Sequence, residues 1–320
     1  MKDKLLKILS KTGMPSVLRN LKGESVTVLC LHRISDEEDF FFKPIQPKTF
    51  EKLVQYCIKY YDVITFSEID SNTTKRKLIL SFDDGYYDFI ENVVPILEKY
   101  RIGCNHNYIN SCINNNEVIW TQKLNDAFNH LKNNEITNDP SITAIGASYS
   151  NDWFEYYMHV FNFLLSSESS KRNDFIDQLL NAYNLTPSYR MMNWDEIIDC
   201  RNNHKVEVGS HTFNHKSLQS VTNDEEIITE IDNSIEEFEI KLNSKIEVLS
   251  LPNGQYNPTV MEHIKRKGIK YTLLVDDKIN ATKEVLKVCN LVSRIYLVDE
   301  PIYEMILRTE LFHSKLRRSK

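Results

Sequence analysis

The 320-residue chain is long enough for one large domain or two small ones, and its 41% hydrophobic and 26% charged residues are ordinary for a globular protein. A formal net charge of −6 gives no concentrated basic surface for a phosphate backbone, so nucleic acid is not an expected partner. The six cysteines form no Cys-x-x-Cys pair, which argues against a zinc ribbon or a thioredoxin-type site and fits a reducing compartment.

The first 22 residues place lysines around a short apolar pattern, Leu5, Leu6, Ile8 and Leu9. Basic residues at 11, 19 and 22 interrupt this pattern, so we expect no standard signal peptide and no membrane span, and hence a cytoplasmic protein. Two interpretations of the segment stay open. A basic amphipathic helix can touch the anionic inner face of a membrane, and the alternative is a helix packed on the domain edge.

Short β-type runs alternate with helical runs along most of the chain, which is the pattern of an α/β protein with a parallel sheet. The expected strands are 26–31, 62–66, 77–82, 102–108, 206–209, 247–251, 271–275 and a last short one at 294–298. The helical spacing predicts helices at 50–60, 88–100 with a bend or restart at Pro95, 194–200, 224–242 and 259–267.

Residues 110–190 lose this alternation and are rich in Asn, Ser, Phe and Tyr, with helical stretches at 120–131, 153–165 and 171–183. Because these aromatic residues need to be buried, we expect a mainly helical insertion rather than a linker. The predicted fold is a distorted (β/α) barrel of about seven strands, with a doubly wound sheet as the alternative. In both architectures the C-terminal ends of the strands carry the chemistry.

The expected organisation has three parts. Residues 1–22 form the N-terminal segment, residues 23–300 form one domain that carries the insertion, and residues 301–320 form a C-terminal helix with a basic tail.

Polar clusters follow three of the apolar runs. The first is the run SFDDG at 81–85, which in isolation is commonly a turn with Gly supplying a positive φ. The second ends a strand and contains His211 and His215, whose i, i+4 spacing lets two imidazoles on one face of a helical turn point at one metal. A carboxylate from one strand end and this pair from another make a three-ligand site with open positions, the pattern of a catalytic metal.

Two adjacent aspartates, Asp83 and Asp84, end the first cluster. Their side chains diverge in a strand-end turn, so one can bind the metal while the other faces the substrate. A bound divalent cation lowers the pKa of water to roughly 7, and a neighbouring carboxylate can complete its deprotonation, which is the chemistry of amide or ester hydrolysis. The third cluster, PNG at 252–254, can direct a backbone N–H into the site as an oxyanion donor, with an ordinary β-turn as the alternative.

These clusters, in this order, resemble the motifs of the polysaccharide deacetylase (NodB-homology) family, over roughly residues 24–298 except a region near 125–190. The resemblance implies that Asp83 is the general base and that the metal ligands are Asp84, His211 and His215. It also implies that the loop of Pro252, Asn253 and Gly254 supplies the oxyanion-hole amide.

The run HRI at 32–34 resembles a subgroup with circularly permuted motifs, in which a histidine after the first strand is the general acid. His32 is therefore the candidate acid, with a core or supporting histidine as the alternative. The chain departs from the family at the proline loop, which typically reads Arg-x-Pro-Tyr with an arginine that tunes the base. The residues directly before Pro252 are LSL at 249–251, so that arginine is absent from the loop. Arg33 or Arg294 are the candidates to supply the missing positive charge.

The implied activity is metal-dependent removal of N-acetyl groups from amino sugars in a polysaccharide, oligosaccharide or lipid-linked sugar, in cell-surface polysaccharide biosynthesis. Zinc suits the ligand set, and cobalt, nickel, iron and manganese can use the same ligands. Two alternatives stay open: a carbohydrate-binding protein whose catalysis is impaired, and an amidohydrolase acting on a non-sugar amide. Aromatic residues at 40–42 and 86–87 could line a sugar-stacking cleft or belong to the core.

Overall fold

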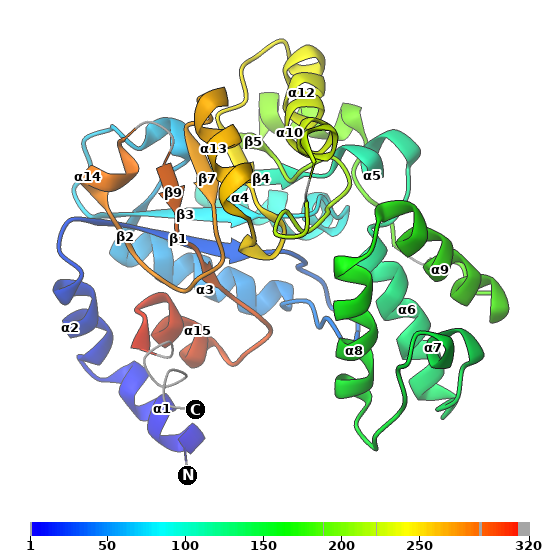
Figure 1. Cartoon of the computed structure of the whole chain (residues 1–320). Helices are drawn as coiled ribbons and strands as arrows, with labels where there is room; N and C mark the ends of the chain where they lie inside the picture. The colour runs from blue at the N-terminus through cyan, green and yellow to red at the C-terminus, as the bar shows by residue number, and fades with distance from the viewer. Residues whose placement is uncertain (1, 188, 222, 288–289, 313–320) are drawn as a thin grey trace.

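The computed structural model describes residues 2–187, 189–221, 223–287 and 290–312. Its centre is one curved, mostly parallel sheet in the order β10-β1-β3-β4-β5-β6-β7-β9 (Figure 1), to which β2 adds beside β3 and β8 adds antiparallel to β1. The strands are β1 (Ser25–Leu31), β2 (Tyr61–Val63), β3 (Arg76–Phe82), β4 (Cys104–Tyr108), β5 (Val206–Ser210), β6 (Val248–Ser250), β7 (Tyr271–Leu273), β8 (Asn280–Ala281), β9 (Asn290–Val292) and β10 (Ile295–Tyr296).

The two outermost strands of this sheet are consecutive in the chain. β9 ends at Val292 and β10 begins at Ile295, so Ser293 and Arg294 alone join opposite edges of the sheet. The sheet therefore curls into a nearly closed barrel, and the predicted distorted barrel is confirmed.

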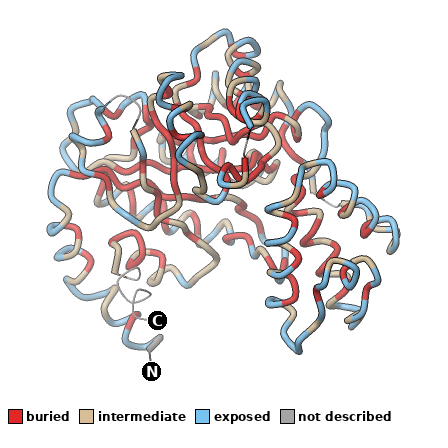
Figure 2. The backbone as a smooth tube through the Cα atoms, in the orientation of Figure 1, coloured by how far each residue is buried: buried red, intermediate tan, exposed pale blue. Residues whose placement is uncertain are grey.

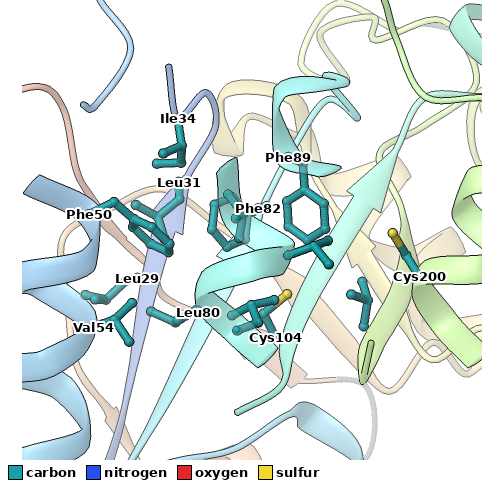
Figure 3. Packing of buried hydrophobic residues seen from close by; sticks show 14 of the residues in the cluster. Leu29, Leu31, Ile34, Phe50, Val54, Leu80, Phe82, Phe89, Cys104 and Cys200 are labelled. Atoms are coloured by element: carbon teal, nitrogen blue, oxygen red, sulfur yellow. The ribbon is translucent and has the colours of Figure 1, made fainter. Parts of the chain in front are cut away.

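Helices α3 (Pro47–Tyr60), α4 (Val94–Tyr100), α10 (Trp194–Asn203), α12 (Ser234–Leu242) and α13 (Pro258–Lys267) cover the barrel. Every residue of β1 is buried, as expected for a parallel strand that is covered on both faces. Leu29 and Leu31 of β1 and Phe82 of β3 pack with Phe50 and Val54 of α3 in the main hydrophobic core (Figure 3).

Several predicted elements differ from the structure in length or in regularity. The strand expected at 62–66 ends at Val63, because Thr65 and Glu68 form a capping box that starts a 3₁₀ turn, Phe66–Glu68. A π-helical segment, Phe89–Val93, precedes α4, which has Pro95 in its first turn, so the expected restart at this proline is confirmed. The helix expected at 224–242 is α11 (Asp224–Ile227) and α12 with a π-helical segment between them.

The helices expected within the insertion are α6 (Trp120–Asn133), α8 (Trp153–Ser166) and α9 (Ser169–Ala182), joined by the short α5 (Asn110–Asn115) and α7 (Pro140–Ala144). They enclose a second hydrophobic cluster around Leu124, Phe128, Tyr156 and Val160. Figure 2 shows buried segments of the insertion apart from the buried segments of the barrel. The aromatic residues of the insertion are thus largely buried, while the domain boundaries stay a prediction.

The N-terminal segment forms two helices, α1 (Lys2–Lys11) and α2 (Met14–Leu21), near the C-terminal α15 (Ile302–Thr309) (Figure 1). The buried carboxylate of Glu310 pairs with Arg19 at 3.1 Å and Lys22 at 2.8 Å, which ties this segment to the domain edge. Within the described ranges, no helix is both long and apolar enough to cross a bilayer. Five cysteines are free and buried, and Cys289 lies outside the described residues.

Candidate active site

The chemical residues predicted from the sequence converge at the C-terminal ends of the strands. Asp83 and Asp84 follow β3, His211 follows β5, the PNG turn follows β6 and His32 follows β1. Asp84 and Gly85 both have positive φ, 76° and 89°, in the turn after β3. A Cβ on Gly85 would lie 2.8 Å from the Tyr108 ring, so this tight turn requires glycine.

Asp84, His211 and His215 form a buried group whose potential ligand atoms all lie within 4.8 Å of one another. Oδ1 of Asp84 is 3.4 Å from Nε2 of His211 and 3.7 Å from Nε2 of His215. Ligand atoms that share a tetrahedral metal at about 2.1 Å lie about 3.4 Å apart. Oδ1 of Asp84 is buried and accepts no hydrogen bond from the described residues. The donor set and its spacing therefore fit a divalent cation.

The histidine motif does not adopt the helical turn that its spacing suggested. Thr212 and His215 have φ values of 64° and 52°, so the segment 211–215 is an irregular loop, and the interpretation of one helical face is wrong. Glu230 holds this loop instead, because its carboxylate accepts hydrogen bonds from both the backbone and the side-chain nitrogen of Asn214 at 2.9 Å. The two imidazoles still meet, with ring centroids 4.8 Å apart.

A hydrogen bond fixes the orientation of the His211 ring, and Trp120 contacts His215. Nδ1 of His211 lies 2.9 Å from the carbonyl oxygen of Ser250, so Nδ1–H donates to that oxygen and Nε2 keeps a lone pair for a metal. The indole N–H of Trp120 lies 3.3 Å from Nδ1 of His215 and 3.4 Å from the carbonyl oxygen of the same residue. In the tautomer that binds a metal through Nε2, Nδ1 carries the proton and the indole N–H donates to that carbonyl.

Asp83 is the most strongly held group in the site. Arg294 donates to both of its oxygens at 2.9 and 2.7 Å, and Asn107 donates to Oδ1 at 2.8 Å. Burial alone would raise the pKa of this carboxyl, but the charges of Arg294 and His211 hold the pKa well below its usual range. Asp83 is therefore ionised at neutral pH.

The position of Arg294 resolves which arginine contacts the candidate base. Arg294 lies in the two-residue link between β9 and β10, is fully buried, and forms its ion pair with Asp83 at 2.7 Å. Arg33 forms its ion pair with Asp88 instead, at 2.9 Å. The charge missing from the proline loop thus comes from the link between β9 and β10, where Arg294 also donates to the hydroxyl of Ser250 at the end of β6.

A second group, Cys30, His32 and Asp83, also lies within metal-binding distance. Burial raises the pKa of the Cys30 thiol well above its usual value, and the Arg294 cation already occupies both oxygens of Asp83. A cation there would meet a protonated thiol and a positive neighbour. This group therefore fits a metal poorly.

A cavity of about 340 Å³ connects the predicted residues with the helical insertion. Its walls carry His32, both aspartates, both histidines and Asn253, together with aromatic residues of α8. Of the aromatic runs at 40–42 and 86–87, Phe41 and Phe42 line this cavity, whereas Tyr86 is buried against Arg33. A larger cavity of about 660 Å³ reaches the opposite ends of the strands and contains none of the predicted site residues.

Residues 155–272 match the family model described as polysaccharide deacetylase, a stretch that includes both histidines and the PNG turn. The predicted resemblance to the polysaccharide deacetylase family is confirmed. The enzyme class expected from it, an N-deacetylase, is confirmed with it. No curated protein sequence matches the chain.

Three solved structures share the fold of this chain. The first is Streptococcus pyogenes deacetylase PplD in complex with acetate, with 16% identity and a TM-score of 0.57 over 89% of this chain and 98% of that chain. The second is IcaB from Ammonifex degensii, with 14% identity and a TM-score of 0.59 over 90% of this chain and 98% of that chain. The third is a de-N-acetylase from Aggregatibacter actinomycetemcomitans, with 16% identity and a TM-score of 0.53 over 86% of this chain and 95% of that chain. At these identities the likeness concerns the fold.

The proline loop places one of its three predicted residues, Asn253, on the cavity wall. Asn253, with φ 54°, lines the cavity, Pro252 is buried, and a Cβ on Gly254 would lie 2.5 Å from the backbone nitrogen of Val275. The amide of Gly254 donates to Leu251. The Asn253 amide is therefore the better candidate for an oxyanion donor.

His32 lies on the cavity wall between two aromatic rings. Its ring meets Phe42 and Tyr296 edge-on, with centroids 5.6 and 5.5 Å away. Burial lowers the pKa of His32, and the nearby charges of Asp84 and Asp83 oppose that shift. A neutral His32 can take up a proton before it donates one.

Sequence reasoning missed the contribution of the insertion to the site. Thr121 and Asn125 of α6 and Phe154, Tyr157, Met158 and Phe161 of α8 line the same cavity. No motif marks these residues. The available signal was the unusual composition of 153–166, which has apolar residues on more than one helical face.

Arg172 of α9 supports the histidine loop from the insertion. It is buried, donates to the carbonyl oxygen of Asn214 at 3.1 Å, and stacks over the Trp120 ring with its guanidinium carbon 4.8 Å from the centroid. We expect Arg172→Gln to weaken metal affinity by about 10–100-fold because it loosens His215. Titration of the metal-free protein with zinc measures this change. Arg201→Gln on α10 is the control, and an unchanged affinity in Arg172→Gln would contradict the supporting role.

Proposed function

We propose that this chain is an enzyme that depends on a divalent metal, for which zinc suits the ligands best, and that it removes N-acetyl groups from amino sugars. The observation that carries this proposal is the buried group of Asp84, His211 and His215 at the strand ends, facing a cavity beside an ionised Asp83. One carboxylate and two imidazoles leave coordination positions open for water and substrate.

We assign roles to the chain's own residues as follows. Asp84, His211 and His215 would hold the cation, which when bound lowers the pKa of water and polarises an amide carbonyl. Asp83 accepts the proton of the attacking water. Because Arg294 stabilises its charge, Asp83 is a weak base, and the transfer needs water that is already acidified.

The remaining roles concern the leaving group and the oxyanion. His32 takes up a proton and delivers it to the departing amine. The backbone N–H of Asn253 donates to the oxygen of the tetrahedral intermediate, where charge develops. Both residues line the cavity that contains Asp83.

The substrate proposed is an N-acetylated glycan or a lipid-linked amino sugar of cell-surface polysaccharide biosynthesis. The neighbours named a deacetylase in complex with acetate and a de-N-acetylase are consistent with this reaction. We also propose residues 23–300 as the deacetylase domain. Peripheral contact with the inner face of a membrane through residues 1–22 is part of the same proposal, since Leu5 and Ile8 of α1 are exposed beside lysines.

Two alternatives remain distinct from this function. A carbohydrate-binding protein that lost catalysis with the loop arginine is disfavoured by the ion pair between Arg294 and Asp83, which supplies the same charge from another strand. An amidohydrolase acting on a non-sugar amide would use the same ligands.

The test is metal analysis of the purified chain followed by acetate release. We expect about one divalent metal per chain and acetate from N-acetylglucosamine oligosaccharides or their lipid-linked forms, and no release after chelation. Metal binding without acetate from any amino sugar, together with hydrolysis of a cyclic imide, would replace the proposal with the non-sugar amidohydrolase.

A further inference from the structure

We propose that the site is built for an amino sugar that carries an apolar chain, and that the first part of this chain lies along α8. This inference rests on the proposed function, because it names the substrate class of the same site. It follows from how polar and apolar side chains are divided along one cavity.

The inner part of the cavity is polar and holds the reacting groups, Asp83, Asp84, His211, His215 and Asn253. Much of the remaining wall carries hydrocarbon, aromatic and thioether groups, from Phe41, Phe42, Phe154, Met158, Phe161 and Val275. Thr121, Asn125, Tyr157 and Tyr296 add polar atoms to it. A substrate that fills this cavity therefore needs a polar end at the aspartates and an apolar end beyond them.

Helix α8 explains the apolar end, because it carries two apolar faces. Tyr156, Val160 and Leu164 are buried in the cluster of the insertion. Phe154, Met158 and Phe161, at i, i+4 and i+7, share the face that lines the cavity. Phe154 is 52% exposed, so the protein itself does not cover the outer end of this face. Exposed apolar surface that continues a substrate cavity is expected where a ligand covers it.

A buried polar residue of the insertion indicates where the sugar part of the substrate lies. Asn125 of α6 lines the cavity, is almost completely buried, and its Oδ1 accepts no hydrogen bond from the described residues. A sugar hydroxyl is a suitable donor to this oxygen. Further sugars of a polymer would need more such partners. Met158 and Val275 instead present surfaces that suit a hydrocarbon chain better than a ring of hydroxyl groups.

The surface of α1 is consistent with a substrate anchored in a membrane. Leu5 and Ile8 are 55% and 60% exposed, and Lys4, Lys7 and Lys11 are exposed on the same helix. Figure 1 shows α1 and α8 both extending beyond the same side of the sheet. A basic apolar helix suits an anionic membrane surface, from which a lipid-linked sugar would enter the cavity.

The experiment compares the metal-loaded full chain on the methyl and octyl glycosides of N-acetylglucosamine, both below micelle-forming concentrations. Each methylene that becomes buried contributes about a fourfold gain in affinity. We expect kcat/KM for acetate release to be roughly tenfold or more higher for the octyl glycoside, mainly through a lower KM. Octyl glucoside, which has no acetamido group, should compete with the methyl substrate.

Variants locate the effect on α8. Phe154→Gln combined with Met158→Gln should bring the octyl-to-methyl ratio of kcat/KM to about one and abolish competition by octyl glucoside. Phe163→Gln is the matched control, because Phe163 is exposed on the same helix and does not line the cavity, and it should keep the wild-type ratio. Circular dichroism checks that each variant is folded.

The outcomes separate the two proposals. No acetate from either glycoside or from oligosaccharides would refute the proposed function itself. Acetate released equally well from both glycosides would overturn the apolar-chain proposal alone. A gain that follows the number of sugars in an N-acetylglucosamine oligomer, with no gain from the octyl group, would also overturn it in favour of a glycan polymer.

Discussion

Asp84→Asn should release the bound metal and abolish deacetylation, whereas Asp83→Asn should keep the metal and lose most of its turnover. Oδ1 of Asp84 lies 3.4 and 3.7 Å from the Nε2 atoms of His211 and His215, so the loss of this charge removes one of three ligands. Arg294 donates to both oxygens of Asp83, so this carboxylate is already paired, and its loss removes the proton acceptor. We expect kcat of Asp83→Asn to fall by about 10²–10⁴-fold.

Metal content after dialysis and acetate release measure this pair of variants. Asp199→Asn on α10 is the matched control, since Asp199 is largely exposed and lies on the outer surface, and it should retain both properties. Full metal content in Asp84→Asn would contradict the ligand assignment. Acetate release at the wild-type rate by Asp83→Asn would contradict its role as the base.

Arg294→Met should destabilise the fold and impair catalysis together. Arg294 is fully buried, and its removal leaves the Asp83 carboxylate charged and unpaired within the barrel. Breaking a buried pair in this way costs about 3–5 kcal/mol of the free energy of unfolding. Adding Asp83→Asn to this variant removes the unpaired charge and should restore part of the stability. Arg190→Met, which breaks an exposed ion pair with Glu196, should cost at most about 1 kcal/mol.

The ion pair between Arg294 and Asp83 makes the free energy of unfolding depend on pH. The folded chain holds the pKa of Asp83 below its unfolded value of about 4, so the stabilisation is present above pH 4 and is lost as the pH falls further. Arg294→Met should reduce this loss in acid. Urea unfolding of both proteins at pH 7 and pH 3.5 measures it. Equal stability of Arg294→Met and the wild type at pH 7 would contradict the importance of the ion pair.

The sequence was sufficient for the barrel and for the meeting of its motifs. Apolar runs as long as β1 and β3 predict buried parallel strands. Polar residues directly after such strands lie together at one end of the sheet. β8, β9 and β10 contain two or three residues each, which is too few for any periodicity. β8 and β9 were therefore not predicted, and β10 was predicted too long.

The parts of the site that sequence reasoning missed depend on contacts between distant segments. The spacing of His211 and His215 suggested a helical turn, but an irregular loop forms there, held by hydrogen bonds that Asn214 donates to Glu230 and that Arg172 donates to Asn214. Arg294 reaches Asp83 because barrel closure brings β10 beside β1, and local sequence does not encode that neighbour. The wall formed by α8 likewise depends on how the insertion packs beside the barrel.

The most direct test of the central claim is a crystal structure of the chain grown with zinc, with anomalous diffraction recorded at the zinc edge. We predict one strong peak bound by Asp84 and by Nε2 of His211 and His215, at about 2.0–2.2 Å from each ligand atom. A peak on Cys30, His32 and Asp83 instead, or an active enzyme whose Asp84, His211 and His215 bind no ion, would contradict the claim.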